Sequence, residues 1–239
     1  MHTVYKFKRF IETFVLLHGF LNYSPNMIIP KLHYISQGNS QKEHLDNIQK
    51  ACTSGVELVQ LGLKGVSEKK FLKIATTARE ITSHFQTRLI ISANYKIAKD
   101  IKADGVHLEE TDSCPTLVRK HLYTWQMIGG TAHTFQDCKI LISKDIDYIS
   151  LSPFRIMNTS TNLSQPLGLS GYTAIAEALN TETPIIGIGG ITTIDVKAIL
   201  KTGISGIAVS EAITQNFDVI REFHQLLNAS ATAEQRHTF

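Results

Sequence analysis

Short apolar runs and amphipathic stretches alternate along the chain from about Lys31 onward. The apolar runs are rich in Val, Ile and Leu, which is typical of strands buried on both faces of a parallel sheet. The stretches between them place apolar residues at helical spacing. Eight strands are predicted, at residues 32–35, 57–61, 88–92, 105–108, 127–131, 148–151, 184–188 and 206–210.

Helices are predicted between these strands, and one more follows the last strand. They cover residues 43–53, 69–83, 96–101, 115–122, 135–142, about 169–179, a stretch from Thr192 that Gly203 ends, and 217–227. Ile194, Val196 and Ile199 are expected on the apolar face of the seventh helix. Eight parallel strands that close into a barrel leave no exposed edge. We therefore expect a single (β/α)8 TIM barrel, for which 239 residues is a typical length.

The first 26 residues differ from this pattern. They begin with basic residues and continue with an apolar run that Glu12 and His18 interrupt. The run is too short to span a bilayer, and no small-residue cleavage site follows it, which argues against a signal peptide. We predict an N-terminal extension (1–26) outside the active site, a barrel domain (27–230) and a C-terminal tail (231–239).

Charge and cysteine content narrow the function classes. The net charge is only +3 and the basic residues are scattered, which argues against a nucleic-acid partner. Three cysteines lie far apart without metal-ligand spacing, as expected for reduced thiols in a cytoplasmic protein. No membrane association is predicted, and the sequence leaves open whether the chain forms a homo-oligomer.

The glycine pair after the seventh predicted strand is the first candidate site. Loops after the last two strands of a (β/α)8 barrel commonly hold a phosphate through backbone N–H groups. Gly189 and Gly190 follow the seventh strand, and Val209 and Ser210 end the eighth. These four residues are predicted to bind a phosphate, the alternative being that the glycines only form a tight turn.

Polar residues follow the other predicted strands and extend this rim. One cation, three carboxylates and several hydroxyls could hold a phosphorylated ligand. The carboxylates could do so through Mg²⁺, which prefers carboxylate and phosphate oxygens. The alternatives are a solvated loop at 109–112, a helix cap at Asp112, a surface charge at Lys64, a helix start at His133 and a hydrogen-bonded core histidine at His107. The rim residues are Gln60, Lys64, Ser92, Asn94, Glu109, Glu110, Asp112, Thr131, His133, Thr159 and Ser160.

Over about residues 31–227 the sequence resembles the thiamine phosphate synthase family, which includes the related thiazole tautomerases. The matching words are Val59-Gln60-Leu61 with Lys64, Ala103-Asp104-Gly105-Val106-His107-Leu108, Asp112, Ile128-Gly129 with Thr131-Ala132-His133, Asp147-Tyr148-Ile149, Pro153, Pro166-Leu167-Gly168-Leu169, Ile188-Gly189-Gly190-Ile191 and Ala208-Val209-Ser210.

The resemblance implies a barrel enzyme of thiamine biosynthesis that joins an aminopyrimidine diphosphate to a thiazole phosphate, with Mg²⁺ and release of pyrophosphate. It places Asp112 on the metal and gives Lys64 and Thr131 the catalytic roles. Substrate binding is expected from Gln60, Lys64, Ser92 and Ser160 on the diphosphate side, from Thr131 and His133 near the pyrimidine, and from Thr159, Gly189, Gly190, Val209 and Ser210 on the thiazole phosphate side.

Departures from the family pattern gather on the diphosphate side. The family has Arg at Gly62, Asn-Asp at Ser92-Ala93 and Lys at Ser160, so two cations and one Mg²⁺-binding carboxylate are missing. The resemblance therefore predicts a synthase with weak or no turnover. One rival is a paralogue that binds a thiazole or thiamine phosphate without turnover. The other is a different phosphate-handling barrel enzyme that uses Glu110 and His133 as acid and base.

Overall fold

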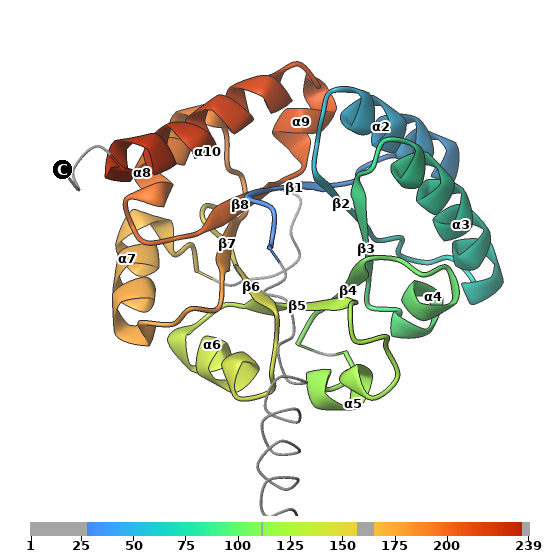
Figure 1. Cartoon of the computed structure of the whole chain (residues 1–239), viewed down its shortest axis with the longest axis horizontal. Helices are drawn as coiled ribbons and strands as arrows, with labels where there is room; N and C mark the ends of the chain where they lie inside the picture. The colour runs from blue at the N-terminus through green and yellow to red at the C-terminus, as the bar shows by residue number, and fades with distance from the viewer. Residues whose placement is uncertain (1–27, 111, 157–164, 236–239) are drawn as a thin grey trace, which may run out of the picture.

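The computed structural model describes residues 28–110, 112–156 and 165–235. In this part of the chain eight parallel strands pair in sequence order, and the pairing of β1 with β8 closes the barrel. Figure 1 shows the strands at the centre of a ring of helices, as the sequence predicts. The strands are β1 (Leu32–Ile35), β2 (Leu58–Leu61), β3 (Arg88–Ser92), β4 (Gly105–Leu108), β5 (Met127–Ala132), β6 (Tyr148–Leu151), β7 (Ile185–Ile188) and β8 (Gly206–Val209).

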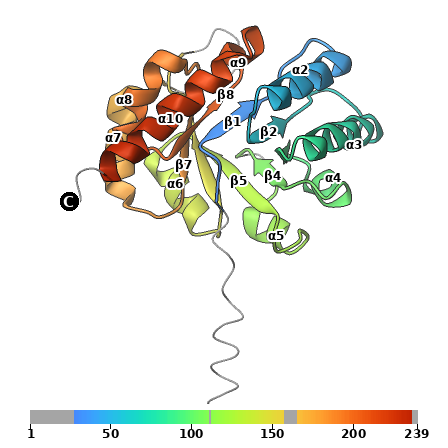
Figure 2. The same ribbon diagram turned by 45° about the horizontal axis from the view of Figure 1, so that its top comes forward.

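Helices cover the outside of the barrel and connect consecutive strands, as Figures 1 and 2 show. Where one helix is predicted after the eighth strand there are two, because Asn216 has an extended backbone that ends the first. The helices are α2 (Gln41–Thr53), α3 (Glu68–His84), α4 (Tyr95–Asp100), α5 (Pro115–Arg119), α6 (Phe135–Ile142), α7 (Gly168–Leu179), the 3₁₀ turn η1 (Thr193–Asp195), α8 (Val196–Leu200), α9 (Glu211–Gln215) and α10 (Val219–Gln235).

The prediction for Ile194 is wrong. It lies in η1 instead of on the buried face of α8, and 85% of its surface is exposed. Val196 and Ile199 are buried as predicted. Thr192 and Asp195 form a reciprocal capping box at the start of η1, which satisfies backbone N–H groups that have no partner within the helix.

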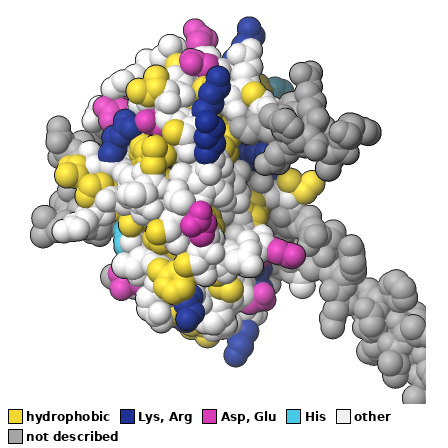
Figure 3. All heavy atoms as spheres, turned by 90° about the vertical axis from the view of Figure 1, so that its left-hand side faces the viewer, with side chains coloured by type: hydrophobic (Ala, Val, Ile, Leu, Met, Phe, Trp, Pro, Cys, Tyr) yellow, Lys and Arg dark blue, Asp and Glu magenta, His cyan; other side chains and the backbone are white. Residues whose placement is uncertain are grey.

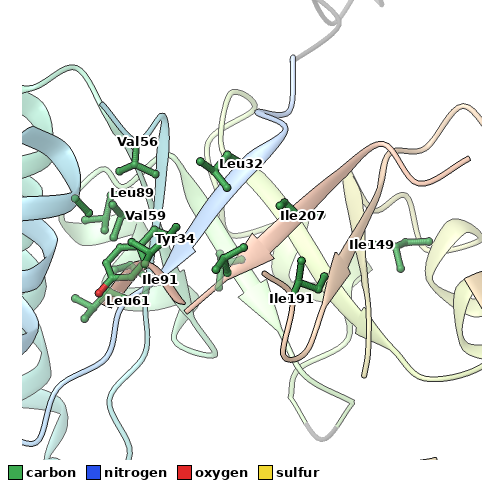
Figure 4. Close-up of a cluster of buried hydrophobic side chains, with 14 of the residues drawn as sticks. Leu32, Tyr34, Val56, Val59, Leu61, Leu89, Ile91, Ile149, Ile191 and Ile207 are labelled. Atoms are coloured by element: carbon green, nitrogen blue, oxygen red, sulfur yellow. The ribbon is translucent and has the colours of Figure 1, made fainter. Parts of the chain in front are cut away.

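Alternate residues along each strand serve two separate cores. Outward-facing side chains pack under the helices, and Figure 4 shows part of this cluster, including Tyr34, Val59 and Leu89. Burial of each such side chain contributes about 1.5–3 kcal/mol. The second core fills the barrel interior and contains Leu58, Ile90, Met127, Tyr148, Ile186 and Ala208, with Ile29 packed against both parts.

Gly129 on β5 makes room for the largest side chain of the interior. A Cβ atom at residue 129 would lie 2.1 Å from Cζ of Tyr148, whose ring is fully buried. At the next position, a Cβ at Gly130 would meet only the methyl tips of Leu141 and Ile146, at 2.9 to 3.1 Å. The Tyr148 ring thus fills the space that a side chain at residue 129 would need.

Replacing Gly129 with Ala is expected to destabilise the barrel by about 3 kcal/mol, because the buried Tyr148 ring cannot move aside. Gly130→Ala is the matched control on the same strand. It should cost about 1 kcal/mol or less, since flexible side-chain tips can yield. Urea denaturation of both variants gives the two free energies of unfolding. Equal losses of unfolding free energy in the two variants would show that the Tyr148 ring does not cause the destabilisation.

The extension predicted at residues 1–26 lies outside the described residues, and α10 continues to Gln235, past the predicted boundary at 230. Among the described helices, none combines the length and apolarity needed to cross a bilayer. Figure 3 shows one face of the molecule, on which basic and acidic side chains are interspersed. This mixture gives no basic patch on that face.

Candidate active site

The turn after β7 has backbone angles that favour glycine at two successive positions. Gly189 and Gly190 have φ angles of 110° and 65°, which side chains of L-residues rarely allow. A Cβ at Gly189 would lie 2.9 Å from the backbone nitrogen of Phe154, so the loop after β6 packs directly on it. No described residue accepts a hydrogen bond from the backbone N–H of Gly190 or Ile191. These two donors remain available to a ligand.

The end of β8 lies beside this turn because β7 and β8 are neighbours in the barrel. The Val209 side chain is buried in the outer core, so only its backbone can reach a ligand. The Ser210 hydroxyl donates to the carbonyl oxygen of Ile35 at 2.7 Å. The serine backbone N–H can therefore still donate to a ligand, and the hydroxyl oxygen can still accept from one. Strand order therefore brings Gly189, Gly190 and Ser210 to neighbouring strand ends, and their binding of one phosphate stays a prediction.

An ion pair that the sequence did not reveal ties the loop after β6 to this turn. The Arg155 guanidinium lies 2.5 Å from Oδ1 of Asp195, and the Arg155 backbone N–H donates to the carbonyl of Gly189 at 3.2 Å. Oδ2 of Asp195 also accepts from the backbone and hydroxyl of Thr192. No local motif marks Arg155, because its partner is 40 residues away. The predicted ligands Thr159 and Ser160 lie outside the described residues.

Two residues of the predicted diphosphate side are hydrogen-bonded to each other. Nε2 of Gln60 donates to Oγ of Ser92 at 3.0 Å, and Gln60 is only 6% exposed. A Cβ at Gly62 would lie 2.9 Å from the same Ser92 oxygen. Ala93 has a φ angle of 65°, a conformation that suits Asn or Asp better than Ala. Lys64 is exposed beyond β2.

A cavity of about 300 Å³ brings together three other predicted residues, Asp112, Thr131 and His133. It opens beside the ends of β4 and β5, and Glu109 and Glu110 also line it. Gln60, Ser92 and the glycine turn lie at other strand ends, outside this lining. The predicted residues thus form three groups at the carboxyl ends of the strands.

Hydrogen bonds fix two of the cavity residues. Asp112 accepts the backbone N–H of Glu109 at 2.8 Å through Oδ2 and holds its own loop. It does not cap α5, whose N-cap position is Cys114, so that alternative is wrong. Nδ1 of His133 is 2.8 Å from the carbonyl oxygen of Ser152. A carbonyl only accepts, so Nδ1 carries the proton in the neutral ring and Nε2 is left as an acceptor.

His107 is the hydrogen-bonded core histidine that the sequence suggested, and it reaches the cavity through Thr131. Its Nε2 lies 2.9 Å from Oγ1 of Thr131, and its Nδ1 lies 3.1 Å from the hydroxyl of Tyr148. Burial lowers the pKa of His107, while the carboxylates of Glu109 and Asp112 act in the opposite direction. The burial effect is the larger, so the ring is neutral near pH 7.

Magnesium would find few protein ligands here. No three His, Cys, Asp or Glu side chains of the described residues are grouped to hold a metal ion. Asp112 offers one carboxylate, with Oδ2 already accepting a backbone N–H. Mg²⁺ commonly takes only one or two carboxylates and completes its shell with water and substrate phosphates. The residues present fit such a weak, substrate-completed site.

Comparison with known proteins places the chain among thiamine phosphate enzymes. The family model described as thiamine monophosphate synthase matches residues 32–213. The thiamine-phosphate synthase of Flavobacterium johnsoniae is 38% identical over 206 residues, covering 84% of this chain and 97% of the relative. That of Bacteroides fragilis is 34% identical over 200 residues, covering 82% and 98%.

Solved structures support the same fold. The thiamine phosphate pyrophosphorylase of Pyrococcus furiosus superposes with a TM-score of 0.73 at 22% identity, covering 87% of this chain and 98% of that one. The enzyme of the same name from Bacteroides thetaiotaomicron gives 0.59 at 17% identity, covering 87% and 100%. At these identities the likeness shows the barrel alone. Because the family model spans most of the chain and relatives exceed 30% identity, the chain belongs to the thiamine monophosphate synthase family.

Proposed function

We propose that this protein joins an aminopyrimidine diphosphate to a thiazole phosphate and releases pyrophosphate, with a turnover far below that of an intact synthase. The observation that carries the proposal is the contrast between two parts of the rim. The turn after β7 has two glycines with φ angles of 110° and 65°, followed by backbone N–H groups of Gly190 and Ile191 that no described residue accepts. On the diphosphate side, Gly62, Ser92 and Ala93 stand where the family resemblance implies an arginine, an amide and a carboxylate.

On the thiazole side, the backbone N–H groups of Gly190, Ile191 and Ser210 would hold the phosphate. Backbone donors near helix starts bind phosphate without any added cation. Thr159, predicted from the sequence, would add a hydroxyl contact. Arg155 carries a positive charge beside this turn, although Asp195 already pairs with it.

On the pyrimidine side, Thr131 and His133 would contact the heterocycle, and Gln60, Lys64 and Ser92 would face the diphosphate. Lys64 is the remaining predicted cation there and would stabilise the charge that develops on the departing diphosphate. Mg²⁺ held by Asp112 and substrate oxygens would supply further positive charge when bound. Loss of one such charge costs roughly 2–4 kcal/mol in the transition state, so several losses predict slow turnover.

A second candidate function has its own support. Gln60 already donates to Ser92, and a side chain at residue 62 would crowd that same serine oxygen, so these residues are less free to receive a diphosphate. A protein of this kind would bind the monophosphate of a thiazole or of thiamine without turnover. The two candidates differ only in whether condensation occurs.

A turnover assay with both substrates and Mg²⁺, run beside the Flavobacterium johnsoniae synthase, separates the candidates. We expect slow formation of thiamine phosphate, at least about 100-fold below the reference enzyme. Calorimetry with each substrate alone should show binding of the thiazole phosphate and weak binding of the diphosphate. Binding without product would favour the second candidate, and turnover equal to the reference would contradict the proposed weakness.

A further inference from the structure

We infer that Tyr148 and His107 fix the hydroxyl of Thr131 as a hydrogen-bond donor toward the cavity, so that the site selects a heterocycle with an acceptor at that position. The identity of the heterocycle rests on the proposed function. The assignment of the Thr131 hydroxyl as a donor does not rest on that function, because it follows from hydrogen bonds among three side chains inside the barrel.

The chain of contacts is short and buried. The Tyr148 hydroxyl lies 3.1 Å from Nδ1 of His107, and Nε2 of the same ring lies 2.9 Å from Oγ1 of Thr131. Tyr148 is fully buried and His107 is 2% exposed, so water cannot replace these partners. Only Thr131 reaches the cavity.

Two proton arrangements are conceivable, and the phenol of Tyr148 decides between them. A neutral imidazole donates from one nitrogen and accepts at the other. If Nδ1 carried the proton, Tyr148 would accept it, and its own O–H would have no acceptor among the described residues. The neighbouring His33 ring does not accept this O–H either, because Nδ1 of His33 has no hydrogen-bond partner among the described residues. An unsatisfied buried donor is costly.

The remaining arrangement orders all three groups. Tyr148 donates to Nδ1 of His107, and the Nε2–H of His107 donates to Oγ1 of Thr131. The proton of the Thr131 hydroxyl is then free to point into the cavity. Burial also raises the pKa of Tyr148, which keeps its phenol protonated and able to donate. Thr131 is therefore a specificity-determining donor, and Tyr148 and His107 are positioning residues.

Nitrogen-15 NMR of the histidine rings tests the donor assignment without any ligand. In the wild type we expect a pyridine-like Nδ1 and a pyrrole-like Nε2 for His107, with the signals assigned from their loss in His107→Gln. Tyr148→Phe removes the donor to Nδ1 and should shift this tautomer equilibrium. Tyr34→Phe is the matched control, since Tyr34 is equally buried but bonds Thr214. A protonated Nδ1 in the wild type would overturn the assignment.

Ligand selection is tested with an aminopyrimidine diphosphate and with analogues in which one ring nitrogen is replaced by C–H. Thr131→Val should weaken binding of the pyrimidine by about 3- to 10-fold, as expected for one net hydrogen bond, and Thr131→Ser should restore it. Thr131→Val should not weaken binding of the analogue that lacks the contacted nitrogen. An equal effect on every analogue would overturn the selection. If no heterocycle binds the wild type, the proposed function fails, while the NMR result still decides the donor assignment.

Discussion

Restoring the four family residues on the diphosphate side is expected to raise kcat/KM for thiamine phosphate formation by more than about 100-fold. The changes are Gly62→Arg, Ser92→Asn, Ala93→Asp and Ser160→Lys. They return two cations and one Mg²⁺-binding carboxylate to one leaving group. Each single change should raise kcat/KM by less than about 10-fold, because groups that neutralise one leaving group act as a unit.

The structure adds a reason why the changes must be combined. A side chain at residue 62 would press on Oγ of Ser92 at 2.9 Å and disturb its bond with Gln60. Gly62→Arg alone should therefore lose stability without gaining much turnover. Ala93→Asp should be well tolerated, because Asp accepts the left-handed backbone that Ala93 already has.

The matched control is a second fourfold variant that carries Ala93→Asn in place of Ala93→Asp. Asn tolerates the same backbone but lacks the charge, so the kcat of this control should show a weaker dependence on Mg²⁺ concentration. Thermal denaturation of each variant confirms that it is folded. Brisk condensation by the unchanged chain, or equal Mg²⁺ dependence of both variants, would show that other groups hold the metal.

Replacing Gly190 with Val should weaken binding of a thiazole monophosphate by about 10- to 100-fold, which corresponds to the loss of one or more charge-assisted hydrogen bonds. At a φ angle of 65° a β-branched side chain is strained, and the backbone must rotate away from its phosphate-binding form. Calorimetric titration with the monophosphate measures the change.

Gly55→Val is the control for strain alone. Gly55 has a φ angle of 90°, and a Cβ there would have no atom within 4 Å. It lies in the turn after α2, away from the glycine turn. Both variants should lose stability, by about 1–3 kcal/mol each, but only Gly190→Val should lose affinity. Unchanged affinity in a folded Gly190→Val variant would remove the phosphate assignment.

The fold was predictable because its pattern is local. Each strand is a short apolar run and each helix has its own spacing, so all eight strands were placed within one or two residues. The errors came where local spacing was ambiguous. Ile194 fitted an apolar helical face but lies in a 3₁₀ turn, and the five-residue helix α9 before Asn216 was not predicted.

The site was predictable only as far as strand ends define it. Position after a strand suggested Thr131, His133 and Asp112, and the structure brings these three to one cavity. Contacts between side chains on neighbouring strands and loops could not be predicted from the sequence, because their partners are far apart along the chain. The bond between Gln60 and Ser92 and the pair of Arg155 with Asp195 span 32 and 40 residues.

The two ends of the loop after β6 are joined to each other and to β7 by a small group of backbone hydrogen bonds. Phe154 donates to Ile188 at 2.7 Å, and Leu167 and Gly168 return to the carbonyls of Pro153 and Phe154 at 2.9 and 3.0 Å. The chain between them thus leaves and rejoins the barrel at one place, and doubling its length would cost only about 0.6 kcal/mol in closure entropy. Changes in the length or sequence of the segment that joins these two ends are therefore expected to cost the barrel little stability, so this segment can vary independently of the fold.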